Sequence, residues 1–231
     1  GLYYELSEIM ERENKDMIVN MLYVRSSLER ANESRREMEA VNVKLLKQSE
    51  TDQMTGLANR YRLNAYSEKV LDYCYEHRLP LAMEILDIDF FKQYNDNYGH
   101  QQGDECIIAI ANELKKMEDG QTFCARYGGD EFIIIYAGIS AEEVHAKAGA
   151  LRQNIMDLKL EHLYSKALPI VTISQGISYG VPEEGNRSWD FLHTADMLLY
   201  QVKKKSRNDI CIADIRGQEL DLSSKQEKVE P

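Results

Sequence analysis

Short apolar runs alternate with amphipathic segments from residue 56 onward, and this alternation restricts the chain to a layered fold. Five runs have the length and apolar content of strands, at 79–89, 121–127, 131–137, 168–180 and 208–214. Apolar residues at helical spacing mark most of the segments between them, beginning at 58–78. After that first helix the order is βααββαβαβ. This order predicts one central sheet with helices on its faces, an α/β or α+β sandwich.

The N-terminal stretch has a different pattern, because residues 2–55 contain neither glycine nor proline. Two heptad series run through it: Met10, Met17, Val24, Ala31, Met38 and Leu45, and four residues later Met21, Leu28, Arg35 and Asn42. A two-residue heptad seam favours a parallel coiled-coil dimer, in which Arg35 and Asn42 weaken the register or fix it. The alternative is a long helix that packs on its own domain.

These patterns divide the chain into three parts. Residues 1–50 form a signalling helix or coiled coil, and residues 51–216 form the folded domain. Residues 217–231 are mostly polar, which is typical of a flexible tail.

Charge excludes some partners. The formal net charge of -11 argues against a protein that binds duplex DNA, which needs a broad basic surface. No apolar run approaches the roughly 18 residues of a membrane span. We therefore expect no nucleic-acid partner, no membrane contact by this fragment, and a cytoplasmic location.

Two pairs of acids stand at the ends of apolar runs. Asp87 and Asp89 close the run at 79–89, and Asp130 and Glu131 follow a Gly-Gly hairpin signal and open the next buried run. A single acid in such a place is more often a helix cap or turn former. Two neighbouring strands with carboxylates at one sheet edge would make an oxygen-lined site for Mg²⁺. Such sites support two-metal phosphoryl displacement.

Four motifs, in order, resemble the diguanylate cyclases of the GGDEF family. They are "TDQMTGLANR" (51–60), "DIDFFKQYNDNYGHQQGD" (87–104), "RYGGDEF" (126–132) and "ADMLLYQVKKKSRN" (195–208). The resemblance implies a central, mostly antiparallel five-stranded sheet flanked by helices, related to nucleotidyl cyclases and polymerase palms. It also implies condensation of two GTP into cyclic di-GMP with release of pyrophosphate.

The resemblance implies a set of metal and catalytic residues. Asp87 and Asp130 would bind Mg²⁺ through their carboxylates, and Ile88 through its backbone carbonyl, with two ions per site and Mn²⁺ as a substitute. Asp130 is the usual candidate for the base, and Glu131 stands beside it. The motif does not separate those two roles. Lys92 would stabilise charge that develops on the phosphates.

A second set would bind the substrate. Asn95 and Asp104 stand where the family reads guanine, and a carboxylate accepts well from the N1–H and amino groups of that base. Lys203 and Arg207 lie four apart, so a helix would put them on one face toward the triphosphate. Phe90 completes the set. Without the resemblance, turn chemistry and a solvated basic helix end would explain these segments.

The same resemblance bears on regulation and partners. Relatives often carry an R-x-x-D product site, but residues 119–122 here read Asp-Gly-Gln-Thr, so inhibition through that site is not expected. Cyclisation needs two half-sites that face each other, which predicts a homodimer through the coiled coil. An upstream sensor would control it, and the protein could then be the cytoplasmic part of a membrane-bound sensor.

Two rival functions stay open. One is a catalytically inactive module that binds GTP or a protein partner. The other is a nucleotidyl cyclase with a different product, which Asp104 disfavours.

Overall fold

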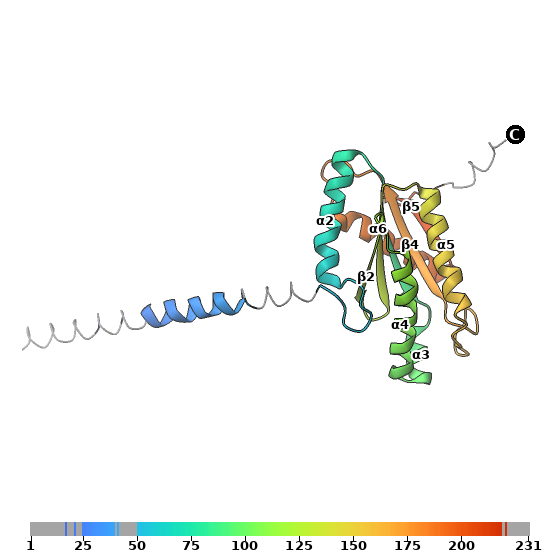
Figure 1. Ribbon diagram of the computed structural model, residues 1–231, viewed down its shortest axis with the longest axis horizontal. Helices are drawn as coiled ribbons and strands as arrows, with labels where there is room; N and C mark the ends of the chain where they lie inside the picture. Colours follow the sequence, from blue (N-terminus) through green and yellow to red (C-terminus); the bar gives the residue numbers. More distant parts are fainter. Residues whose placement is uncertain are drawn as a thin grey trace, which may run out of the picture. The chain divides into compact units, whose positions relative to one another are not determined.

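The computed structural model describes residues 17, 21, 25–39, 41, 50–218 and 220. The chain divides into two compact units, residues 1–49 and 50–231. In the first unit residues 25–39 are helical (Figure 1). Residues 17, 21 and 41 are helical as well. The other residues of the predicted N-terminal helix, and most of the predicted tail at 217–231, lie outside the described residues.

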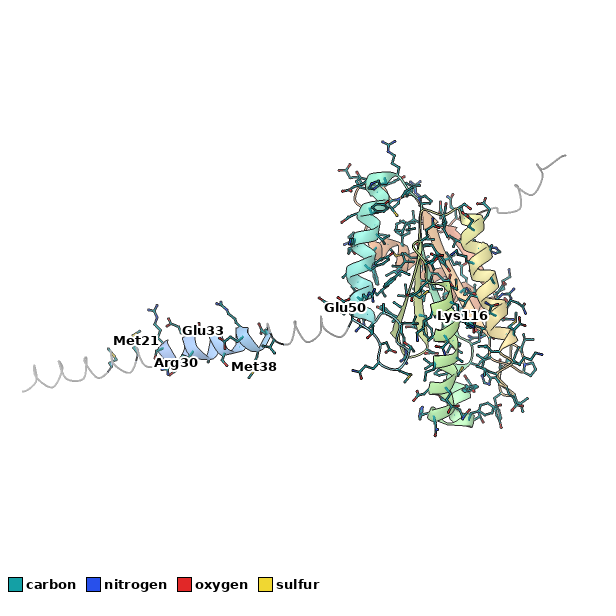
Figure 2. All side chains as sticks on the ribbon, viewed as in Figure 1. Met21, Arg30, Glu33, Met38, Glu50 and Lys116 are labelled. Carbon is teal, nitrogen blue, oxygen red and sulfur yellow. The ribbon has the colours of Figure 1, made fainter. Side chains whose placement is uncertain are left out.

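Heptad residues of the first unit are exposed where the structure describes them. Met21 and Met38, labelled in Figure 2, have exposed fractions of 73% and 67%. Met17 and Leu28 are each 62% exposed. No helix among the described residues combines the length and the apolar character that a bilayer crossing requires.

The second unit is built on a five-stranded sheet. Its strands are β1 (Leu81–Ile88), β2 (Thr122–Gly128), β3 (Glu131–Ala137), β4 (Ile173–Gly180) and β5 (Ile210–Asp214). They are ordered β2-β3-β1-β4-β5. Every neighbouring pair is antiparallel except β4 and β5, which are parallel. The mostly antiparallel five-stranded sheet is therefore confirmed.

Helices cover both faces of this sheet. They are α2 (Arg60–His77), α3 (Phe91–Tyr98), α4 (His100–Met117), α5 (Ala141–Asp157) and α6 (Ser188–Lys205). Alternate residues of β1 enter two cores: Ala82 and Leu86 pack with α4 and α5, and Leu81 and Met83 pack with α2. In Figure 1, α2 lies on one side of the sheet and α5 on the other. The predicted α+β sandwich is confirmed.

The position of α6 depends on a glycine in β4. A Cβ added at Gly176 would lie 2.2 Å from the carbonyl oxygen of Ala195 and 2.3 Å from the backbone nitrogen of Leu199. Only glycine lets the helix backbone come this close to the strand. As a result the C-terminal half of α6 lies against the sheet, where Lys203 reaches the end of β1.

The segment that leads into the domain attaches to the edge strand β2. Thr51 pairs with Ala58, and Ala58 pairs in turn with Ala125 of β2. The backbone nitrogen of Arg126 also donates to the carbonyl of Ala58 at 2.9 Å. These contacts cover part of an otherwise unpaired sheet edge and bring the entry segment close to the hairpin between β2 and β3.

Candidate active site

Three acids lie near one another where β1 ends and β3 begins. Asp87, near the end of β1, lies directly opposite Glu131, the first residue of β3, and Asp130 immediately precedes Glu131. Burial raises the pKa of Asp87 to about 6. A bond from Lys203 opposes that rise, and the charges of Asp130 and Glu131 add to it. Carboxylates gathered in this way favour a bound cation.

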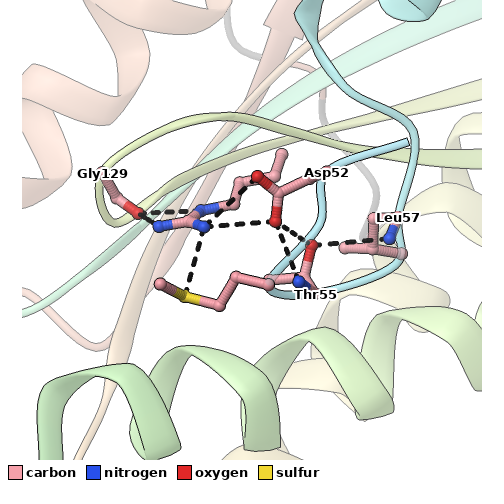
Figure 3. Close-up of polar contacts among 6 residues, drawn as sticks. Asp52, Thr55, Leu57 and Gly129 are labelled. Carbon is pink, nitrogen blue, oxygen red and sulfur yellow. Dashed lines mark hydrogen bonds and ion pairs between the residues drawn. The ribbon is translucent and has the colours of Figure 1, made fainter. Parts of the chain in front are cut away.

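The hairpin that carries Asp130 has a tight two-residue turn. Gly128 pairs with Glu131, which leaves Gly129 and Asp130 to make the turn. Gly129 has a φ of +56°, a left-handed conformation that favours glycine. The guanidinium of Arg126 donates twice to the carbonyl of Gly129, at 3.1 Å from Nε and 2.8 Å from Nη2 (Figure 3). Arg126 therefore holds the turn in place from inside the hairpin.

The same guanidinium also binds the entry segment. Its Nη1 donates to the two carboxylate oxygens of Asp52 at 3.2 and 3.4 Å. Asp52 further accepts bonds from the backbone nitrogen of Thr55 at 2.9 Å and from its hydroxyl at 2.7 Å (Figure 3). Burial alone would raise the pKa of Asp52, but the bonds from Thr55 and Arg126 outweigh it and lower the pKa. No role for Arg126 or Asp52 was predicted. The only signal was that both lie inside the quoted motifs.

Two cationic side chains contact the acids at the end of β1, one from α6 and one from the turn after it. Lys203 donates to Asp87 at 2.7 Å. Arg207 was predicted to share a helix face with Lys203, and this is wrong because α6 ends at Lys205. Arg207 lies beyond the helix with a φ of +55°. Its guanidinium lies 4.3 Å from the ring centroid of Phe90, and its Nη1 lies 3.5 Å from Asp89.

Asp89 serves a different purpose from Asp87. It is fully buried and accepts bonds from the hydroxyls of Thr172 and Ser174, at 2.8 and 2.7 Å, and from the backbone nitrogen of Asn208 at 2.9 Å. Both carboxylate oxygens of Asp89 thus already accept hydrogen bonds from within the protein. These bonds connect β4 and the turn after α6 to the end of β1. Although Asp87 and Asp89 close the same apolar run, only Asp87 lies opposite Glu131.

The remaining residues of the predicted site lie along the start of α3. Ile88 is the buried last residue of β1, and Phe90 is half-buried with a φ of +57°. Lys92 is exposed in the first turn of α3. Ile88 and Lys92 therefore flank one short turn, two residues before and two residues after Phe90.

Asn95 of α3 lies against the first turn of α4, next to Asp104, because residue 103 is a glycine. A Cβ at Gly103 would lie 1.8 Å from Oδ1 of Asn95, so α3 and α4 can approach only because residue 103 has no side chain. Oδ1 of Asn95 is buried and has no hydrogen-bond partner among residues 50–218. Asp104, which follows Gly103 in α4, is exposed. An unpaired buried oxygen beside an exposed carboxylate suits a ligand with several N–H donors.

A family model described as diguanylate cyclase, GGDEF domain, matches residues 49–209. The chain belongs to the GGDEF domain family.

Individual relatives agree with this assignment. The GGDEF chain is 35% identical over 163 residues to a probable diguanylate cyclase, DgcC, of Escherichia coli, covering 69% of this chain and 42% of that protein. It is 31% identical over 162 residues to a diguanylate cyclase of Vibrio cholerae, covering 70% of this chain and 49% of that protein. The chain thus spans less than half the length of these relatives.

A solved structure resembles more of the chain. The coiled coil and GGDEF domain of DgcB from Caulobacter crescentus, in complex with c-di-GMP, superposes with a TM-score of 0.66 at 28% identity. The match covers 80% of this chain and 97% of that one.

The oxygen donors of this GGDEF domain fit a hard cation. In the part of the chain that the structure describes, no group of three or more acidic, histidine or cysteine side chains is placed to enclose a metal by itself. Mg²⁺ does not require such a cage, since it is usually held by one or two carboxylates together with substrate phosphates. Asp87 and Asp130, with the carbonyl of Ile88, match that smaller donor set.

Proposed function

We propose that this GGDEF domain is an active, Mg²⁺-dependent diguanylate cyclase that condenses two GTP into cyclic di-GMP and pyrophosphate. The observation that carries the proposal is the meeting of Asp87, Asp130 and Glu131 at one sheet edge, with Lys203 bound to Asp87 at 2.7 Å. An inactive module would have no need for three mutually repelling acids at neighbouring ends of β1 and β3.

Asp87, Asp130 and the carbonyl of Ile88 would hold the Mg²⁺ ions, or Mn²⁺ in their place. When bound, the ions would polarise the α-phosphate and lower the pKa of the attacking 3′-hydroxyl. Asp130 would bind metal and, with Glu131, is the candidate to take the proton from that hydroxyl. Burial raises the pKa of Glu131, which suits a group that accepts a proton.

Three cationic side chains would bind the triphosphate, and the ring of Phe90 would orient one of them. The ammonium group of Lys203 is bound to Asp87 in this structure. If Mg²⁺ took its place on Asp87, the ammonium group would be free to bind a phosphate oxygen. Lys92 would approach the phosphates from the start of α3. Arg207 offers a planar fork of donors, and its stacking on Phe90 limits the directions that this fork can take.

Asn95 and Asp104 would select guanine over adenine. The carboxylate of Asp104 accepts from two adjacent N–H groups of guanine, and adenine offers no such pair. Oδ1 of Asn95, which lacks a partner among residues 50–218, would gain one. A site built to accept these hydrogen bonds rejects a base that cannot donate them.

The two half-sites would be brought together by a homodimer. The heptad residues Met17, Met21, Leu28 and Met38 are exposed, as expected if a partner helix covers them. A cytoplasmic setting and control by an upstream sensor are part of this proposal. The proposed sensor agrees with the fact that the chain spans less than half the length of the curated relatives it matches.

Product inhibition through the family's R-x-x-D site would be absent. Asp119, at the position of the usual arginine, accepts bonds from Lys147 and from the backbone of Gln121, both at 2.8 Å. These contacts shape the turn before β2. We expect added cyclic di-GMP to leave the initial rate unchanged at concentrations that inhibit relatives with the motif.

Chromatography of the products formed from GTP and Mg²⁺ tests the proposed function. We expect cyclic di-GMP from the wild-type chain and a loss of at least about 100-fold in Asp130→Asn, because that change removes a metal-binding charge. Asp72→Asn is the matched control, since Asp72 is an exposed residue of α2. Tight GTP binding without product would instead support the inactive module.

A further inference from the structure

The turn between β1 and α3 needs support from outside itself. Only Asp89 and Phe90 connect Ile88, the end of the strand, to Phe91, the start of the helix. Phe90 adopts the left-handed conformation, with φ +57° and ψ 30°, which a residue with a Cβ disfavours. Its phenyl side chain has no polar group with which to cap the helix. Neighbouring parts of the chain must therefore hold this conformation.

His162 supplies such a hold from the loop between α5 and β4. It is fully buried, and its Nε2 lies 3.2 Å from the carbonyl oxygen of Phe90. A carbonyl can only accept, so Nε2 carries the hydrogen and donates it. In the neutral ring Nδ1 is then unprotonated, and it has no hydrogen-bond partner among residues 50–218. Burial lowers the pKa of His162, and the bond to Phe90 partly offsets this effect.

The surroundings fix both the ring and the loop that carries it. The ring meets Tyr94 edge-on, with 5.1 Å between centroids and an angle of 84°. The backbone nitrogen of His162 donates to the carbonyl of Pro169 at 3.0 Å. The backbone nitrogen of Leu163 donates to the hydroxyl of Tyr98 at 3.0 Å. The imidazole therefore has little freedom to leave the turn.

We propose that His162 is a positioning residue of the active site. By donating to Phe90 it would keep the turn in its left-handed form, with the carbonyl of Ile88 two residues before it and the ammonium group of Lys92 two residues after it. On the other side Arg207 stacks on the ring of Phe90. Metal and phosphate groups would thus be aligned by a residue that touches neither. This inference rests on the proposed cyclase function.

The competing explanation is a histidine that only fills space in the core. Both explanations predict a less stable protein when His162 is replaced. The two explanations predict different changes in the Mg²⁺ concentration that gives the half-maximal rate. This midpoint does not depend on how much of the protein is folded. Only a displaced turn would raise it.

The test compares His162→Leu, which keeps bulk without a donor, with His162→Gln, whose amide can restore one. In the full chain, at a temperature where both are folded, we expect Leu to raise the Mg²⁺ midpoint roughly three- to tenfold, the effect of one lost buried hydrogen bond. We expect Gln to return it to within about twofold of wild type. Tyr164→Phe, an exposed position in the same loop, should match wild type.

Equal midpoints for Leu and wild type, or a Gln variant no better than Leu, would overturn the proposal. If His162→Leu does not fold, Tyr98→Phe loosens the same loop and should shift the midpoint in the same direction; no shift counts against the proposal. Calorimetry with Mg²⁺ and an α,β-methylene analogue of GTP measures the same effect on binding. Failure of wild type to form product, with analogue binding that weakens in the Leu variant, would reject the cyclase activity but not the role of His162.

Discussion

Glu84 lies in the middle of β1 and is fully buried. Its two carboxyl oxygens accept bonds from the hydroxyl of Tyr136 at 2.8 Å and from the amide of Gln175 at 2.7 Å. Burial raises its pKa to about 7, although both hydrogen bonds act to lower it. At this position the free energy of folding is therefore linked to pH.

The sign of this linkage follows from the two pKa values. In the unfolded chain Glu84 ionises near its usual 4.5, whereas the folded chain keeps the proton until about 7. The stabilisation is complete below the lower value and is lost as the pH rises through the higher one. Between about pH 4.5 and 8 we expect the wild type to lose on the order of 3 kcal/mol of unfolding free energy relative to Glu84→Gln. Urea unfolding across this range measures it, and parallel pH curves would contradict it.

Arg126 joins the entry segment to the turn between β2 and β3. We expect Arg126→Met to lower the free energy of unfolding by about 2 kcal/mol, because Asp52 and the carbonyl of Gly129 each lose a charged donor. The side chain of Arg126 is only 11% exposed, so water cannot fully replace these bonds. Urea denaturation measures the change.

A surface arginine provides the control for this measurement. Arg216 lies 3.9 Å from Glu183, and both side chains are about three-quarters exposed (74% and 75%). We expect Arg216→Met to change the unfolding free energy by less than about 0.5 kcal/mol. Similar losses in the two variants would mean that the contacts of Arg126 with Asp52 and Gly129 add nothing.

Site residues could be identified from the sequence where they interrupt a local pattern, and not where their role depends on a residue far away in the chain. Asp87, Asp130 and Glu131 stand at the ends of apolar runs, where burial makes an acid conspicuous. The contact of Arg126 with Asp52 joins positions 74 apart in sequence, and no periodicity relates them. The contact of His162 with Phe90 is hidden for the same reason, since the two residues are 72 apart in sequence.

At the level of elements, the approach of α6 to β4 sets the position of Lys203. Gly176→Ala would place a Cβ 2.2 Å from a backbone oxygen of the helix, so the helix must shift. We expect a loss of about 1–3 kcal/mol in stability. The moved helix should also carry Lys203 away from Asp87 and slow the proposed cyclase reaction. Gly180→Ala in the same strand is the control, because nothing lies within 4 Å of its added Cβ. Equal effects would contradict this account of α6.

The order of elements could be predicted, and two boundaries could not. The five strands appear where apolar runs predicted them. Helix α4 begins at His100, so the polar residues 100–104, which turn chemistry alone could explain, belong to the helix. The prediction that Arg207 lies on the last helix is wrong, because α6 ends at Lys205, and "KKKSRN" contains neither glycine nor proline to mark that end. Asn208 marks that end by donating its backbone N–H to Asp89, 119 residues earlier in the chain.

For the whole molecule, the main expectation concerns dimer formation by the first unit. We expect Leu28→Gln to weaken a coiled-coil dimer and to lower the specific activity at low protein concentration, because it removes a large apolar side chain from the seam. Glu33→Gln, on the outer side of the heptad, should leave both unchanged. Sedimentation and activity across a dilution series measure these effects. A monomeric wild type with full activity would contradict the role of the coiled coil.

The most direct test of the central claim measures cyclic di-GMP and pyrophosphate together, from the full wild-type chain with GTP and Mg²⁺. The two-metal condensation predicts one pyrophosphate for each GTP consumed and one cyclic di-GMP for every two. Bound GTP without turnover, or pyrophosphate accompanied by a different cyclic product, would contradict it.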